Sequence, residues 1–141
     1  MLECLILGDS IGVGTHMVMP ECMNLSRGGW NTWQWNRDYL SNDLTAGTVI
    51  ISLGSNDHKG VKTRAELEKM RAKVNSQRVF WLLPAGNLPA GGVPISDIQN
   101  IVRSIAQANG DTVLPLTRLQ PDGIHPSGAG YKEIAQQVRG S

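Results

Sequence analysis

Three side chains of this chain have the types and the spacing of a serine nucleophile with its activating base. Ser10 stands between an apolar run and a glycine-rich segment, and Asp122 and His125 lie three positions apart near the other end of the sequence. A serine hydroxyl becomes reactive when an imidazole takes its proton and a carboxylate holds that imidazole in place. The pattern predicts that Ser10 attacks, that His125 is the base and that Asp122 orients it.

A fourth group follows a second apolar run, in the segment Gly54-Ser55-Asn56-Asp57. The side-chain amide of Asn56 can donate a hydrogen bond to a developing oxyanion. Taken singly, Ser10 could be a helix N-cap and Asn56 could close a turn. Together with Asp122 and His125 they favour catalysis. We expect Asp57 and Asp9 to fix loops rather than to transfer protons.

The glycines after Ser10 have two interpretations. Gly12 and Gly14 would let the backbone turn sharply and let a substrate approach the chain. The other interpretation is a phosphate-binding loop, but no lysine follows with the required spacing and no Gly-x-Gly-x-x-Gly is present. We therefore expect these glycines to shape the surroundings of Ser10.

The order of these pieces resembles that of the SGNH hydrolases, also called the GDSL esterase and lipase family. The resemblance extends from Gly8 to Pro126, nearly the whole chain, and the joint spacing is far more specific than Gly-Asp-Ser alone. It implies a triad of Ser10, Asp122 and His125. It also implies an oxyanion hole made by the Ser10 amide, a glycine amide and the Asn56 side chain.

The oxyanion glycine is the piece that departs from the family pattern. Family members usually have one glycine followed closely by a small residue and threonine, whereas here two glycines precede Trp30-Asn31-Thr32. We expect Gly29 to fill this role, with Gly28 as the alternative.

The resemblance implies an ester hydrolase that works through an acyl-enzyme. The chain is shorter than most family members and has no obvious lid or long apolar channel, which favours a short acyl group such as acetyl on a carbohydrate. A lipase, lysophospholipase or thioesterase activity is the alternative within the family. A glycan-binding module that keeps the fold without the chemistry is the alternative outside the enzymes.

Three of the four tryptophans lie within six positions, directly after the predicted oxyanion glycine. Trp30 and Trp33 are three residues apart and can share one face of a helix, whereas Trp35 cannot share that face well. We expect Trp33 in the core and at least one indole exposed near the site. Trp30 is equally suited to the core and to ligand contact. His58, beside Asp57, is a second candidate for substrate contact.

Composition excludes several classes of partner. The net charge is +1, with 13 basic and 12 acidic residues and no run of like charge, so we expect neither nucleic acid nor an anionic membrane as a partner. The histidines are far apart and no Cys-x-x-Cys occurs, so we expect no metal and no cofactor. For the two cysteines, Cys4 and Cys22, free thiols are favoured over the alternative, a structural bridge.

Membrane insertion is not expected either. No apolar stretch approaches the roughly 20 residues that span a bilayer. The N-terminus shows no signal-peptide pattern. These features predict a cytoplasmic protein or part of a larger assembly.

Alternating apolar runs and helical patterns must position these side chains. Strands are predicted at 2–7, 22–26, 48–53, 78–83 and 112–116, and helices at 33–44, 63–74, 95–108 and 130–138, the third with Ser96 as N-cap. The pattern predicts one α/β domain over residues 1–141, a three-layer α/β/α sandwich with a five-stranded, flavodoxin-like parallel sheet.

Ligands of such sheets bind at the carboxyl ends of the strands. Ser10, Gly29, Asn56 and the proline-rich loop at 84–94 each follow an apolar run. We therefore expect them to meet Asp122 and His125 at that edge.

Overall fold

The computed structural model describes residues 2–86 and 93–141, in which strands and helices alternate as predicted. In chain order the elements are β1 (Leu2–Gly8), α1 (Ser10–Val18), β2 (Met23–Ser26), α2 (Thr32–Tyr39), β3 (Ala46–Ser52), α3 (Thr63–Lys73), β4 (Arg78–Leu83), α4 (Ile95–Asn109), β5 (Thr112–Pro115) and α5 (Gly128–Arg139). Helix α1 is not among the four predicted helices, because Gly12 and Gly14 disfavour a helix in that segment. Of the predicted helices, α2 differs most in extent and ends at Tyr39, five residues before the predicted end.

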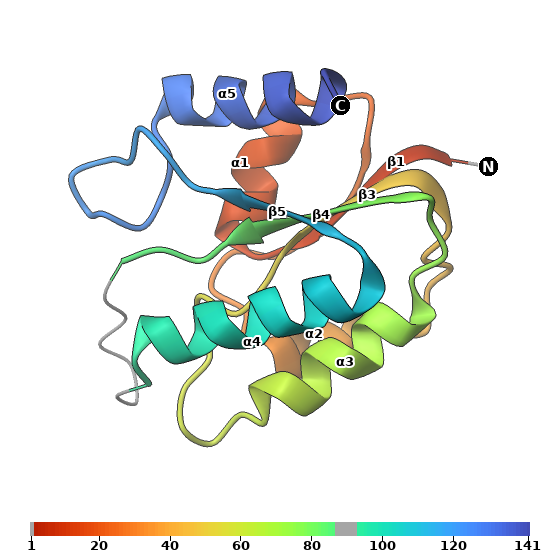
Figure 1. Ribbon diagram of the computed structural model, residues 1–141, viewed down its shortest axis with the longest axis vertical. Coiled ribbons are helices and arrows are strands. Elements are labelled where there is room, and N and C mark those ends of the chain that lie inside the picture. The colour runs from red at the N-terminus through yellow and green to blue at the C-terminus, as the bar shows by residue number, and fades with distance from the viewer. Residues whose placement is uncertain (1, 87–92) are drawn as a thin grey trace.

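The strands form one parallel sheet in the order β2-β1-β3-β4-β5 (Figure 1). This is the flavodoxin-like order, and it confirms the predicted fold class. Strand β2 lies on one side of β1, and β3, the next strand along the chain, lies on the other side of β1. The loops after β1 and β3 therefore lie at the point where the strand order reverses, which is the usual ligand site of such sheets.

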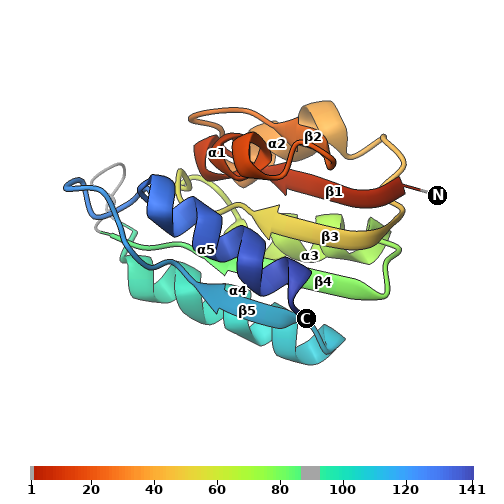
Figure 2. The ribbon, with the colours of Figure 1, turned by 90° about the horizontal axis from the view of Figure 1, so that it is seen from above.

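Helices cover both faces of the sheet, α1 and α5 on one face and α2, α3 and α4 on the other (Figures 1 and 2). Successive side chains along a strand point to opposite faces of the sheet. Leu5 and Leu7 pack in a cluster with Trp35 of α2, and Ile6 packs in a second cluster with Ile134 of α5. Because β1 is buried on both faces, its sequence is a continuous apolar run rather than an alternating one.

Hydrogen bonds beyond the strand ends hold the first two loops in place. Gly8 pairs with both Ser26 and Ser52. The next residue, Asp9, donates its N–H to the Ser52 carbonyl at 3.0 Å, and Arg27 donates its N–H to the Gly8 carbonyl at 3.0 Å. The start of α1 is thus fixed relative to both neighbouring strands.

The cysteine prediction is wrong, because Cys4 and Cys22 form a disulfide with their Cα atoms 4.7 Å apart. The pairing of Leu5 with Met23 in the β1–β2 register brings the two preceding residues, Cys4 and Cys22, opposite each other. Spacing along the chain does not show which strands are neighbours, so the sequence alone does not reveal the bridge.

Two further expectations fail at helix α1 and helix α4. Gly12 and Gly14 lie inside α1, where a Cβ atom would come within 2.4 Å of Ser26 Oγ and 2.2 Å of Tyr131 Cζ respectively. They allow close packing of the helix rather than a turn. Ser96 is not an N-cap, because α4 begins at Ile95 and Pro94 holds that position without a side-chain capping bond.

The predicted loop at 84–94 lies partly outside the described residues. Residues 84–86 and 93–94 are neither helix nor strand, in agreement with the prediction. In the part of the chain that the structure describes, no helix is both long enough and apolar enough to cross a membrane.

Candidate active site

Ser10 is the first residue of α1 and lies at the carboxyl end of β1. Its Oγ is 2.8 Å from Nε2 of His125, a residue 115 positions later in the chain. The N-cap of α1 is Asp9, whose side chain accepts the N–H of Ile11. With Asp9 in this position, the Ser10 N–H lies in the first turn, where N–H groups lack a helical partner.

His125 is held by a tight turn that begins at Asp122. Asp122 Oδ2 is 2.8 Å from His125 Nδ1, and Asp122 Oδ1 accepts the N–H groups of Ile124 at 2.9 Å and His125 at 3.0 Å. Gly123 has φ +70°, a left-handed conformation that favours glycine. The turn thus presents one imidazole nitrogen to a carboxylate and the other to Ser10.

These contacts keep the Asp122 carboxylate ionised. The N–H of Ile124, the His125 ring and the His125 N–H together lower the pKa of Asp122 from 3.8 to about 2. A carboxylate hydrogen-bonded to Nδ1 leaves Nε2 as the atom that can accept a proton from Ser10.

Asn56 follows β3 and points its amide at the loop after β2. Its Nδ2 donates to the Trp30 carbonyl at 3.0 Å and lies 3.5 Å from Asp9 Oδ2. The second contact is long for a hydrogen bond, whose N···O distance is commonly about 2.9 Å. One Asn56 amide proton is used by the Trp30 carbonyl. For the other, an oxyanion beside Ser10 would compete only with the long contact to Asp9.

The two glycine candidates differ in their surroundings. A Cβ atom on Gly28 would lie 3.9 Å from Ser10 Cβ, whereas one on Gly29 would have no neighbour within 4 Å in the part of the chain that the structure describes. Gly29 has φ +78° and turns the chain between β2 and α2. A side-chain position on Gly28 is thus nearer to Ser10 than one on Gly29, the glycine that the sequence favoured, with Gly28 as the alternative.

Asp9 lies buried beneath the site. Its carboxyl group accepts hydrogen bonds from the Ile11 N–H and from Ser52 Oγ, in addition to the long contact with Asn56. Burial raises the pKa of Asp9 from 3.8 to about 7, against the lowering effect of its hydrogen bonds. The contacts agree with the predicted role of fixing the loop.

Asp57 ties the loop after β3 to two helices. It accepts hydrogen bonds from the N–H and the hydroxyl of Thr32 at the start of α2, and from the hydroxyl of Thr63 at the start of α3. Burial raises the pKa of Asp57, while these bonds lower it. Asp57 therefore organises the loop that holds Asn56, as predicted.

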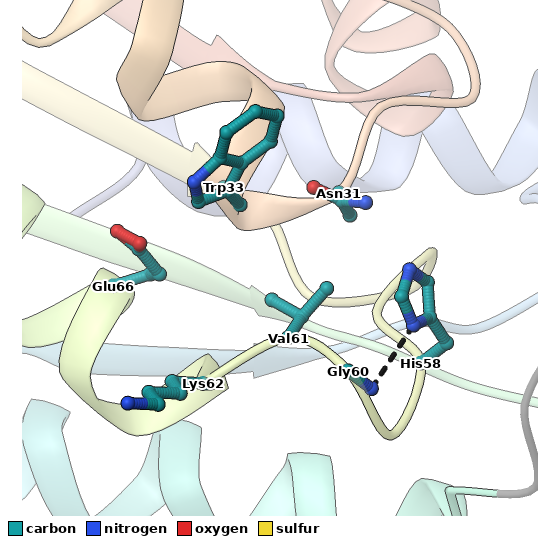
Figure 3. A pocket seen from close by; sticks show the side chains of 7 residues that line it. All are labelled: Asn31, Trp33, His58, Gly60, Val61, Lys62 and Glu66. Atoms are coloured by element: carbon teal, nitrogen blue, oxygen red, sulfur yellow. Dashed lines mark hydrogen bonds between the residues drawn. The ribbon is translucent and has the colours of Figure 1, made fainter.

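A pocket of about 460 Å³ lies between the start of α2 and the loop that precedes α3 (Figure 3). Its lining residues are Asn31, Trp33, His58, Gly60, Val61, Lys62 and Glu66. His58 thus lies in a cavity, as its predicted contact role requires. Its Nδ1 accepts the Gly60 N–H at 3.1 Å.

The prediction that Trp33 lies in the core is wrong, and Trp33 is itself an exposed indole. Trp33 is 53% exposed and lines the pocket, whereas Trp35 is fully buried and donates its indole N–H to the Leu25 carbonyl at 2.9 Å. The ring of Trp30 lies among Arg27, Arg37 and Tyr39. The Trp30 carbonyl, rather than its ring, contacts a predicted site residue, Asn56.

Sequence reasoning missed Glu66, Lys62 and Asn31 as pocket residues. Glu66 belongs to a polar helical pattern that is typical of a solvated face, so nothing in its spacing sets it apart. The only signal at Asn31 is the capping pattern that it forms with Gln34. Within residues 2–86 and 93–141, no three His, Cys, Asp or Glu side chains lie together as metal ligands.

No protein-family model matches the sequence, and a search of curated proteins finds no match. Solved structures do match. A GDSL-like lipase from Bacteroides thetaiotaomicron superposes with a TM-score of 0.71 at 18% identity, over 99% of this chain and 86% of that one.

Two more structures extend the comparison. The C-terminal catalytic domain of peptidoglycan O-acetyltransferase A from Streptococcus pneumoniae gives a TM-score of 0.70 at 13% identity, over 98% of this chain and 90% of that one. A carbohydrate acetylesterase family member from Sinorhizobium meliloti gives 0.58 at 12% identity, over 100% of both chains. The chain therefore has the fold of the GDSL-type, or SGNH, hydrolases, as its motifs predict.

Proposed function

We propose that this protein is a serine ester hydrolase that acts through an acyl-enzyme and removes a short acyl group, acetyl, from a carbohydrate. The observation that supports it most is the hydrogen-bonded chain from Ser10 Oγ through His125 to Asp122, with both distances at 2.8 Å. Ser10 and His125 are 115 positions apart in the sequence, yet the fold brings their side chains into hydrogen-bond contact.

In the first half-reaction His125 Nε2 takes the Ser10 proton while Oγ bonds to the ester carbonyl carbon. The carbonyl electron pair moves onto oxygen, which accepts hydrogen bonds from the Ser10 N–H, the Asn56 amide and the N–H of Gly28 or Gly29. Asp122 stabilises the imidazolium. The bond from carbon to the sugar oxygen then breaks, and that oxygen leaves with the proton from His125.

The second half-reaction releases the acid. His125 takes a proton from water, and the water oxygen bonds to the acyl carbon and forms a second oxyanion in the same place. The bond to Ser10 Oγ breaks and Oγ recovers its proton from His125. The cycle needs no group beyond the residues named and water.

The acetyl and carbohydrate parts of the proposal have two supports. Two similar structures carry names that refer to acetyl groups, on peptidoglycan and on carbohydrate. The sequence carries no run of like charge that would favour an anionic substrate. A lipase or thioesterase would use the same Ser10 chemistry on a different acyl group.

Active-site labelling tests the proposal directly. We expect hydrolysis of p-nitrophenyl acetate and a covalent organophosphate adduct that mass spectrometry locates on Ser10. Ser10→Ala should abolish both, whereas Ser41→Ala, which changes an exposed serine, should abolish neither. Labelling at another residue with turnover intact in Ser10→Ala would refute the assignment.

A series of p-nitrophenyl esters tests the acyl length. A short-acyl site should lose kcat/KM steeply beyond about four carbons. Retained activity on long chains would favour a lipase, and faster cleavage of thioesters would favour a thioesterase. Glycan binding without turnover or labelling would favour a non-catalytic module.

A further inference from the structure

We propose that the pocket lined by Trp33, Asn31, His58 and Glu66 binds a pyranose ring of the substrate. The proposal rests on the ester hydrolase function above and assigns its carbohydrate specificity to particular side chains. Figure 3 shows Trp33 and Asn31 on one side of the pocket and Val61, Gly60 and His58 on the other.

Trp33 supplies a flat apolar platform. Its indole is 53% exposed, an unusual position for the largest side chain, and it lines the pocket. The Arg37 guanidinium lies 5.3 Å from the ring centre but does not line the pocket, so it steadies the indole from outside the pocket. The C–H face of a pyranose ring can pack on such a surface.

The polar groups around Trp33 have unused hydrogen-bonding capacity. His58 Nδ1 accepts the Gly60 N–H, so the neutral ring has its proton on Nε2 and can donate it. Asn31 Oδ1 accepts the Gln34 N–H, which leaves the Asn31 amide protons as donors. Two donors therefore lie beside the platform.

Glu66 adds an acceptor. Its Oε1 accepts hydrogen bonds from Asn36 and Lys69, whereas its Oε2 has no hydrogen bond to the described residues. Sugar hydroxyls donate and accept hydrogen bonds, so one ring can satisfy the two donors and this acceptor together.

The same groups disfavour other ligands. An acyl chain would cover these polar atoms without pairing them, which is unfavourable because a buried polar group needs a hydrogen-bond partner. A phosphate would meet the Glu66 carboxylate as well as Lys62. The volume of about 460 Å³ is in the range of small-molecule sites.

The pocket shares two loops with the candidate active site. Asn31 directly follows Trp30, whose carbonyl accepts the Asn56 amide, and His58 is two residues after Asn56. Ser10, Asn56 and His125 do not themselves line the pocket, so in this proposal the ring binds on the loops that carry the oxyanion donor and its ester group extends out of the pocket to Ser10.

Kinetics on two classes of ester test this inference. With partially acetylated xylo- and chito-oligosaccharides, Trp33→Ala should lower kcat/KM by about tenfold, mainly through KM, and Trp33→Phe should retain most of the activity. With p-nitrophenyl acetate, which has no sugar, the loss of kcat/KM in Trp33→Ala should be clearly smaller than the loss on the sugar esters. Met17→Ala, which truncates another exposed apolar side chain, should change neither substrate.

Unchanged sugar-ester kinetics in Trp33→Ala, or equal losses on both ester classes, would overturn the inference. A loss confined to long-chain p-nitrophenyl esters would also overturn it, because it would assign the pocket to an acyl chain.

Calorimetric titration separates a failure of the pocket from a failure of the chemistry. Ser10→Ala should bind the deacetylated oligosaccharides, and adding Trp33→Ala should abolish the binding. Binding is measured without turnover, so the titration tests the pocket even if the protein does not hydrolyse p-nitrophenyl acetate. No binding by Ser10→Ala would count against the pocket alone.

Discussion

Asp122 uses its two oxygens for different purposes. Oδ1 accepts the N–H groups of Ile124 and His125 and fixes the turn, while Oδ2 orients the imidazole. The same contacts place the pKa of Asp122 at about 2, so it stays a hydrogen-bond acceptor at any ordinary assay pH. An acid limb in the pH profile therefore does not arise from Asp122.

Asp122→Asn should remove this acceptor character while keeping the shape of the side chain. An amide NH2 facing His125 Nδ1 would favour the wrong tautomer, so kcat should fall by about 10²–10⁴ with little change in KM. Steady-state kinetics on p-nitrophenyl acetate measure this. Asp43→Asn, at an exposed site, should retain the full kcat. A small effect in Asp122→Asn would contradict the role of the carboxylate.

Asn56→Ala tests the oxyanion donor. We expect kcat to fall by about 10²–10³, because one donor to the oxyanion is lost while nucleophile and base remain. Organophosphate labelling should be slower but still at Ser10. Asn100→Ala, at an exposed position of α4, is the matched control. Full activity in Asn56→Ala would exclude the side-chain amide from the oxyanion hole.

At the scale of elements, the loop between β5 and α5 sets the position of the base. Gly123 has φ +70°, and a Cβ atom added to it would meet no other atom of residues 2–86 and 93–141 within 4 Å. Gly110 at the end of α4 has φ +72° and equally open space. Alanine at either position therefore meets only backbone strain. Gly123 lies within the turn between Asp122 and His125, whereas Gly110 lies outside it, at the end of α4.

Gly123→Ala and Gly110→Ala form a matched pair. Each should lower the free energy of unfolding by about 1–2 kcal/mol, because alanine resists the left-handed conformation. Only Gly123→Ala should also lower kcat, by shifting His125 relative to Ser10. Urea unfolding and p-nitrophenyl acetate kinetics measure the two effects. Equal activity in the two variants would show that the turn tolerates displacement.

The disulfide between Cys4 and Cys22 joins the start of β1 to the residue before β2, 18 positions apart. Removing both thiols with Cys4→Ala and Cys22→Ala should lower the free energy of unfolding by about 3 kcal/mol, as expected for a loop of this length. Urea unfolding with and without reductant measures this. The double variant should not respond to reductant, and a stability unaffected by reductant in the unaltered protein would refute the prediction.

Strands with a continuous apolar pattern can be predicted from the sequence. The side of a helix that faces the core depends on the segments packed against it, so spacing along the chain does not predict it. Strands β1, β3 and β4 agree with the prediction within two residues at each end, since burial on both faces leaves one long apolar run. The orientation of α2 depends on contacts with distant segments, such as the bond from the Trp35 indole to the Leu25 carbonyl. Spacing alone therefore places Trp33 in the core, although it is exposed.

At the scale of the whole molecule, the sheet explains how far the site can be predicted. Parallel strands end at one edge, so residues after β1, β3 and β5 are expected to meet, and Ser10, Asn56 and His125 follow those strands. The pocket is not predictable, because it forms where α2 meets the loop before α3. Its Glu66 is held there by Asn36, a contact between two helices.

Buried carboxyl groups near the strand ends make stability depend on pH. The pKa of Asp9 is about 7 in the folded protein and near 3.8 as an ordinary carboxyl. Between these values the folded protein retains a proton that the unfolded chain releases, so stability decreases as pH rises through this window. Asp57, with a raised pKa, acts in the same direction. Asp122 acts in the opposite direction, but only below about pH 4.

Asp9→Asn should therefore flatten the pH dependence of stability. Asparagine can still accept the Ile11 N–H as an N-cap, but it has no proton to release. In the unaltered protein Asp9 alone should make the free energy of unfolding fall between pH 4.5 and 7 by up to about 1.4 kcal/mol per pH unit, and Asp57 adds to this slope. In Asp9→Asn only the Asp57 part should remain. Urea titrations at half-unit pH intervals measure it. Asp43→Asn should keep the original slope, and an equal slope in Asp9→Asn would mean that Asp9 is ionised throughout this range.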